Sequence, residues 1–205
     1  MAPVTPDPQR IHAFASEAAF EDWLRAHHDT QPELWLKIHK KGSGLPSVTN
    51  AEAIDVALCW GWIDGLRKGF DENSFLQRFT PRKPRSIWSA INRDNIVRLA
   101  TAGRMTRYGQ AEVDLAKADG RWDKAYSGAA KMEFPPDLLA AIEGEPEAFA
   151  LFRQLNATNR YALAFRTHNM KTEAGRRKKI AAFVEMLKHG ETPYPNGPRA
   201  KARQP

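Results

Sequence analysis

Two short segments of the chain combine aromatic, acidic and cationic side chains closely enough to form a binding or catalytic site. The first, residues 59–67, contains two tryptophans, Asp64 and Arg67. Aspartate is depleted in β-strands, so Asp64 inside a strand-like segment needs a reason. One reading is a scaffold carboxylate paired with an arginine or with backbone amides. The other is a polar group in a pocket walled by Trp60 or Trp62.

The second segment, residues 78–92, is rich in arginines and hydroxyl groups. Its prolines favour extended backbone between a strand and a helix, and guanidinium groups before a helix N-terminus suit anionic oxygens. A solvated basic loop with Ser89 as a helix cap would have the same composition. We predict one ligand site formed by both segments, with Asp64 as acid or base if the protein is an enzyme. Its residues are Trp62, Asp64, Arg67, Arg78, Arg82, Ser86 and Trp88, with Trp60 or Trp88 as a wall.

The sequence lacks the motifs of the common nucleotide and nucleophile sites. There is no phosphate-binding Gly-x-x-x-x-Gly-Lys-Ser/Thr, no Gly-x-Gly-x-x-Gly and no Gly-x-Ser-x-Gly. The six histidines are scattered without metal-ligand spacing. Cys59, the single cysteine, lies in an apolar segment, where cysteine is usually inert packing. We therefore expect no cofactor and no metal.

These residues must be positioned by strands and helices, and the pattern of expected elements predicts an α+β fold. It has a small, mostly antiparallel sheet with packed helices, followed by a C-terminal helical region. Alternating apolar residues indicate strands at 11–14, 33–39, 62–70 and 74–80. The last two form a hairpin that brings residues near 64–67 beside residues near 77–80. Regular alternation places Trp62 and Asp64 on one face of the strand and Arg67 on the other.

Helical periodicity and capping residues complete the organisation. Helices are expected at 16–27, 49–60, 92–102, 106–119, 137–143, 146–155, 157–168 and 172–189. We interpret the chain as a disordered lead-in (1–9), an α+β domain (10–120), a helical region packed on it (121–190) and a flexible basic tail (191–205).

Composition limits the class of protein. The 205 residues are 42% hydrophobic, enough for a core, so a disordered body is excluded. No apolar run approaches the roughly 20 residues of a membrane helix, so we expect no membrane insertion. The first eight residues have no basic or apolar signal region, which favours a cytoplasmic protein. The oligomeric state stays open.

Positive charge is concentrated in two blocks. Residues 67–107 carry ten basic and three acidic residues, and residues 171–205 carry nine and three. Such blocks attract phosphates and nucleic acid, although solubility alone would also explain them.

Several motifs resemble the YdeI/OmpD-associated family, whose members are described as bacteriocin-protection proteins. They are Gly61-Trp-Ile-Asp-Gly65, Arg78-Phe-Thr-Pro-Arg82, Ser86-Ile-Trp-Ser-x-x-Asn92 and Leu99-x-x-x-Gly103-x-Met105-Thr106. The family's C-terminal pattern, Lys-x-x-Glu-Thr-Arg-x-x-Arg-Ile, fits at Arg176, Lys179 and Ile180, but Ala174 and Gly175 replace the Glu-Thr pair. The resemblance implies a small soluble bacterial protein of stress or antimicrobial protection.

Three functions remain open from the sequence. The first is a protection-type protein whose Trp/Arg-lined pocket binds a small anionic ligand. The second is an enzyme on a phosphate- or carboxylate-bearing substrate. The third is non-specific nucleic-acid binding through residues 67–107 and 171–205.

A salt titration distinguishes the third function from the others. If only the basic blocks attract DNA, duplex binding should be micromolar or weaker at physiological salt and should weaken steeply as salt rises. Fluorescence anisotropy with labelled duplexes measures this. A nanomolar, sequence-selective complex at that salt would make nucleic acid the primary ligand.

Overall fold

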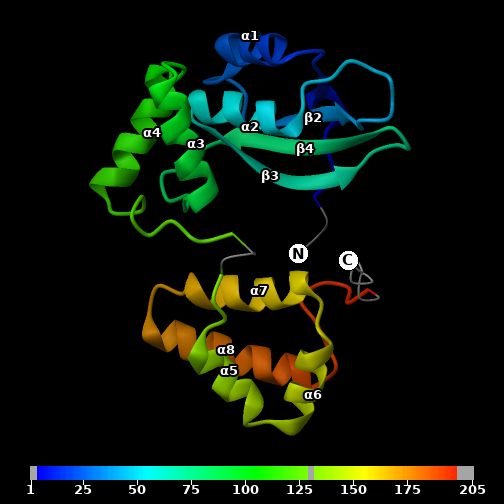
Figure 1. Cartoon of the computed structure of the whole chain (residues 1–205), viewed down its shortest axis with the longest axis vertical. Helices are drawn as coiled ribbons and strands as arrows, with labels where there is room; N and C mark the ends of the chain where they lie inside the picture. The colour runs from blue at the N-terminus through cyan, green and yellow to red at the C-terminus, as the bar shows by residue number, and fades with distance from the viewer. Residues whose placement is uncertain (1–3, 129–131, 198–205) are drawn as a thin grey trace, which may run out of the picture. The chain divides into compact units, whose positions relative to one another are not determined.

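The chain divides into two compact units, with the boundary after Ala125 (Figure 1). The computed structural model describes residues 4–128 and 132–197. Within these ranges, the first unit contains the sheet and four α-helices, and the second contains four α-helices. The predicted α+β class with a helical C-terminal region is confirmed. Within the described ranges, no helix has the length and apolar character needed to cross a bilayer.

The sheet has four strands in the order β1-β2-β4-β3. Their bounds are β1 (Ile11–Ala13), β2 (Leu34–His39), β3 (Trp62–Gly69) and β4 (Ser74–Pro81). The two pairs that involve β4 are antiparallel, while β1 lies parallel to β2, so the sheet is mixed. The hairpin of β3 and β4 is confirmed. Because β3 is an edge strand, its outer side is open to other elements.

In the described part of the first unit, the first two helices cover one face of this sheet, and the next two lie at its end and pack against the second helix (Figure 1). They are α1 (Glu17–His27), α2 (Asn50–Cys59), α3 (Ala90–Thr101) and α4 (Arg107–Ala118). The core between helices and sheet includes Phe20 of α1, which packs against Phe79 of β4 with ring centroids 5.7 Å apart. Burial of such aromatic side chains is the main stabilising contribution to a core of this kind.

Polar caps start each helix of the first unit. Ser16, Thr49, Ser89 and Thr106 each accept a hydrogen bond from a backbone amide in the first turn. At α2 the capping box is complete, because Glu52 also accepts from the Thr49 amide at 2.8 Å. At the start of the described chain, a 3-10 turn (Pro8–Arg10) is capped by Asp7.

The second unit buries a separate core. Its helices are α5 (Pro136–Glu143), α6 (Pro146–Gln154), α7 (Ala157–His168) and α8 (Glu173–Lys188). Leu138, Ile142, Leu163 and Leu187 are among its fully buried side chains. In the first turns of α8, Arg176 binds the Asp137 carboxylate through two nitrogens, at 2.6 and 2.7 Å. This ion pair joins the start of α8 to α5.

The first part of the expected tail is hydrogen-bonded to this unit. The Asn196 side chain accepts from the Asn156 amide at 2.9 Å and donates to the Gln154 carbonyl at 3.1 Å. The Tyr194 amide donates to Asn159 at 2.9 Å. Polar side chains at the start of α7 therefore hold residues 194–196. The rest of the predicted tail, 198–205, and residues 1–3 of the predicted lead-in lie outside the described residues.

Two helices approach each other closely at Gly109. A Cβ on Gly109 would lie 2.3 Å from the carbonyl oxygen of Cys59, the last residue of α2. The Thr106 hydroxyl donates to the same carbonyl at 2.6 Å. The residue that caps α4 therefore provides the hydrogen-bond donor that a carbonyl at the end of α2 lacks within its own helix. Only glycine fits at this contact.

Replacing Gly109 with alanine should therefore destabilise the first unit. We expect Gly109→Ala to reduce the free energy of unfolding by about 3 kcal/mol, the upper part of the usual range for overpacking, measured by urea denaturation. The matched control is Gly42→Ala, where an added Cβ meets nothing within 4 Å. Equal stability of the two variants would show that the α2–α4 contact is looser than described.

Candidate functional site

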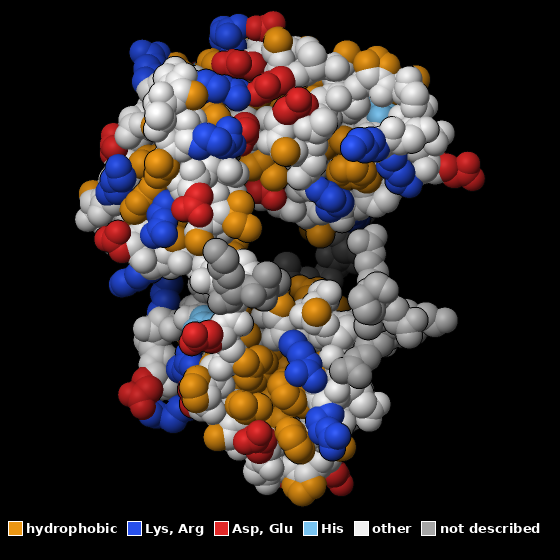
Figure 2. Space-filling view, in the orientation of Figure 1, with side chains coloured by type: hydrophobic (Ala, Val, Ile, Leu, Met, Phe, Trp, Pro, Cys, Tyr) orange, Lys and Arg blue, Asp and Glu red, His pale blue; other side chains and the backbone are white. Residues whose placement is uncertain are grey.

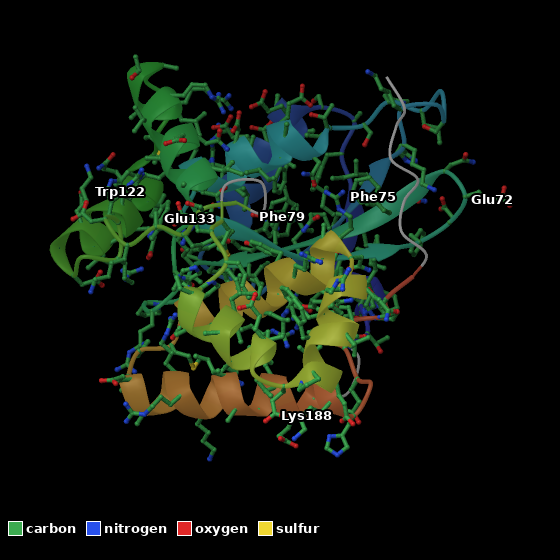
Figure 3. The ribbon with its side chains drawn as sticks, turned by 60° about the horizontal axis from the view of Figure 1, so that its bottom comes forward. Glu72, Phe75, Phe79, Trp122, Glu133 and Lys188 are labelled. Atoms are coloured by element: carbon green, nitrogen blue, oxygen red, sulfur yellow. The ribbon has the colours of Figure 1, made fainter. Side chains whose placement is uncertain are left out.

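An irregularity in β3 determines where the predicted site residues point. Asp64 pairs with Phe79 and Arg67 pairs with Gln77, so β3 has one residue more than β4 between these pairs. Such a bulge shifts the alternation of side chains. The prediction that Arg67 faces away from Asp64 is therefore wrong: by the register, both share the helix-covered face with Phe75 and Phe79 of β4. Figure 3 labels these two phenylalanines.

Gln77 stabilises this bulge. Its side chain is almost fully buried, and its amide donates to the Gly65 carbonyl at 2.9 Å. The Gln77 side-chain oxygen accepts from Nε of Arg67 at 3.0 Å. The side-chain amide of Gln77 therefore binds both the backbone at the bulge and the side chain of Arg67.

Asp64 lies half-buried at the sheet edge between two arginines. Burial raises the pKa of its carboxyl above the ordinary value, and this effect outweighs several groups that lower the pKa. In order of size these are its own backbone amide, the charge of Arg82, a hydrogen bond from Asn92 and the charge of Arg67. Asn92 is in the first turn of α3, so this helix covers Asp64.

Arg82 directly follows β4 and is buried, with 6% of its surface exposed. Its guanidinium carbon lies 3.5 Å from the ring centroid of Trp88, a close cation–π contact. It also donates to the Ile87 carbonyl at 3.3 Å. Trp88 in turn meets Trp122 edge to face at 5.1 Å. Trp88 itself is buried, with 1% of its surface exposed, and its ring covers the guanidinium of Arg82.

Arg67 is exposed, and neutral side chains hold it. Besides Gln77, its Nη2 donates to the Asn50 side chain at 2.7 Å, and the guanidinium lies 4.4 Å from the Phe75 ring centroid. Asn50 is the first residue of α2. Two amides and an aromatic ring thus fix the orientation of this cation without neutralising its charge.

Arg78 has a different environment. It pairs with Trp35 of β2, on the opposite face from Asp64 and Arg67. Its Nε donates to the Glu33 carboxylate at 2.6 Å, and Arg10 reaches the same carboxylate at 3.5 Å. The structure therefore does not bring Arg78 together with Asp64.

The remaining predicted residues have structural contacts. Trp62 is buried, and its indole nitrogen donates to the His28 carbonyl at 3.1 Å. The Ser86 hydroxyl accepts from the Lys83 amide at 3.1 Å and closes the turn after β4. Trp60 packs beside His28 and Tyr108, with Tyr108 stacked 5.7 Å away.

The arrangement places one carboxyl, two guanidinium groups and side-chain amides at the outer strand of the sheet. A group with a raised pKa can hold or release a proton nearer neutral pH than an ordinary aspartate. Among the described residues, no cluster of three or more His, Cys, Asp or Glu side chains has the geometry of a metal site. Sequence patterns did not reveal Asn50 and Gln77 as partners of Arg67, since only the register and the bulge bring them together.

Cys59 lies outside this arrangement. Burial raises the pKa of its thiol to about 11, so the reactive thiolate is scarce near neutral pH. The structure thus favours the packing interpretation of this cysteine over a nucleophile.

Comparison with protein families gives two matches. Residues 131–190 match the family described as "Bacteriocin-protection, YdeI or OmpD-Associated", which confirms the expected resemblance over this segment. Residues 12–112 match the family described as "Domain of unknown function (DUF8412)". The motifs within 61–106 lie in this second match. Comparisons with curated proteins and with solved structures gave no match.

The raised pKa of Asp64 has a consequence for stability. The folded state favours the protonated carboxyl, so proton binding by Asp64 adds to the free energy of unfolding. This stabilisation is fully present below the pKa of the unfolded state, about 3.9. It is lost as the pH rises through the higher pKa of the folded state. Asp64→Asn keeps a neutral group, so the variant should match the wild type at acidic pH and melt higher at pH 7. Thermal unfolding between pH 3 and 8 measures both. A variant that is less stable at pH 7 would mean that the ionised carboxylate stabilises the fold.

Proposed function

We propose that this protein, whose residues 131–190 match the YdeI/OmpD-associated family, is a protection-type protein that binds a small anionic ligand at the edge of its sheet. The binding residues are Arg67 of β3 and Arg82, which directly follows β4, and the charges of both act on Asp64. Trp88 forms the wall, and Asn50 and Gln77 orient Arg67. The ligand class is a small carboxylate or phosphate. A cytoplasmic location stays part of this proposal.

The observation that carries the proposal is the contrast between Arg67 and Arg78. Arg78 is compensated by the Glu33 carboxylate, whereas the hydrogen bonds of Arg67 go to the neutral side chains of Gln77 and Asn50. A guanidinium that is exposed, oriented and bonded to neutral groups retains its charge for an incoming anion. Its fixed orientation also lowers the entropy lost on binding.

Asp64 couples this binding to pH. When it is protonated, the site loses one negative charge, and an anion meets less repulsion. Since burial raises the pKa of Asp64, this change occurs at a higher pH than for an ordinary aspartate. Anion affinity should therefore increase as pH falls.

The nucleic-acid alternative is less favoured because carboxylates already bind several cations of the first basic block. Arg78 pairs with Glu33, Arg98 with Asp55, and Arg104 with Glu17. Fewer charges of this block remain for phosphates of a nucleic acid. Catalysis by Asp64 stays a prediction, favoured only by its raised pKa.

Binding of sulfate tests the proposal, since sulfate keeps its charge between pH 5 and 8. We expect saturable binding by calorimetry at constant ionic strength, and a Tm that rises with sulfate and not with chloride. Arg67→Gln should lose the binding. The exposed, charge-matched control Lys41→Gln should retain it. Asp64→Asn should bind sulfate more tightly than the wild type at pH 7, and its affinity should depend less on pH.

Two results would contradict this function. One is the absence of saturable sulfate binding by the wild type. The other is an equal loss in Arg67→Gln and Lys41→Gln, which would show that net charge alone attracts the anion.

A further inference from the structure

A cavity of about 380 Å³ lies entirely within the second unit. Residues of α5, α6 and α7 and of the segment before α5 line it: Met132, Phe134, Leu139, Phe152, Ala157, Arg160, Tyr161 and Ala164. This volume falls within the range of about 300–1,000 Å³ that small-molecule sites have. None of these residues belongs to the anion site of the first unit.

Most of the lining is apolar. Phe134 and Phe152 pack against each other with ring centroids 5.1 Å apart, and Leu139 contributes an aliphatic side chain that is only partly buried. Figure 2 shows hydrophobic side chains gathered on one face of this unit, with both basic and acidic side chains at the border of the patch. The lining of the cavity is apolar except for Arg160 and Tyr161, and such a lining fits a ligand that is apolar along its body and anionic at one end.

Arg160 is the cation among the lining residues, and its orientation is fixed. Its Nε donates to the Leu155 carbonyl at 3.2 Å, and its Nη2 donates to the carbonyls of Phe152 and Arg153 at 3.3 Å. The guanidinium also lies 4.7 Å from the Phe152 ring centroid. Among the described residues, none accepts a hydrogen bond from Nη1 of Arg160, so this nitrogen is available to a ligand.

Tyr161 is the second polar side chain of the lining. Its ring packs against Phe165 at 5.6 Å, so its position on α7 is held by an aromatic contact. No hydrogen bond of its hydroxyl joins it to another described residue. Arg160 and Tyr161 are adjacent on α7, and both line the cavity.

We propose that this cavity binds a small apolar monocarboxylate, with its carboxylate at Arg160 and Tyr161 and its apolar body among Phe134, Leu139 and Phe152. One available guanidinium nitrogen and one hydroxyl match the two oxygens of a single carboxylate. Carbonyl groups occupy the other donors of Arg160, so a multiply charged anion would find too few partners.

Octanoate and its neutral analogue octanamide test this site in the full chain. We expect saturable octanoate binding by calorimetry, about tenfold or more tighter than octanamide, because only the carboxylate forms a charge-assisted hydrogen bond with Arg160. Tyr161→Phe removes a single oxygen and should weaken octanoate about tenfold while changing octanamide little.

Filling the cavity gives an independent readout. Ala164→Leu should abolish binding of both probes, whereas Ala181→Leu, at an exposed position of α8, should retain it. Arg67→Gln should also retain octanoate binding, which separates this site from the anion site. If Ala164→Leu does not fold, Tyr161→Phe decides.

Three outcomes would overturn the proposal. They are the absence of saturable octanoate binding, equal affinity for octanamide, and unchanged octanoate affinity in a folded Ala164→Leu or in Tyr161→Phe.

Discussion

The candidate site of the first unit depends on one extra residue in β3. Side chains of a strand alternate between faces, so an insertion of one residue reverses the face of everything beyond it. Between Asp64 and Arg67 this reversal turns a cation toward the helix-covered face instead of away from it. The buried amide of Gln77 stabilises the bulge through Gly65 and orients Arg67 with its other end. The backbone irregularity and the arrangement of charge are therefore one structural feature.

The partners of each arginine decide what it can do. Arg78 and Arg67 lie on neighbouring strands of the same hairpin, yet one meets a carboxylate and the other meets two amides. Arg82 is buried against Trp88, where the aromatic face offsets part of the loss of hydration. Net charge in a segment is thus a weak guide to binding, because tertiary contacts neutralise some cations and leave others available.

The two units present different chemistry. In the first, a carboxyl with a raised pKa lies between guanidinium groups at a sheet edge. In the second, an apolar cavity is bordered by an arginine that main-chain carbonyls hold in place. The two family matches cover these units separately, residues 12–112 and 131–190. The two proposed ligand sites thus fall in segments that match different families.

The sequence by itself determined the elements, the hairpin and the stretches in which polar groups gather. Periodicity, capping residues such as Thr49 and turn residues are local signals, and the element order follows from them. The sequence also singles out Asp64, Arg82 and Trp88 as candidates, because an aspartate within a strand and arginines next to tryptophan are locally unusual. The tertiary structure alone decided the other features. These are the parallel pairing of β1 with β2, the bulge, the Glu33 partner of Arg78 and the cavity of the second unit. Each depends on contacts between residues distant in sequence, and a one-residue change of register leaves no mark in composition or periodicity.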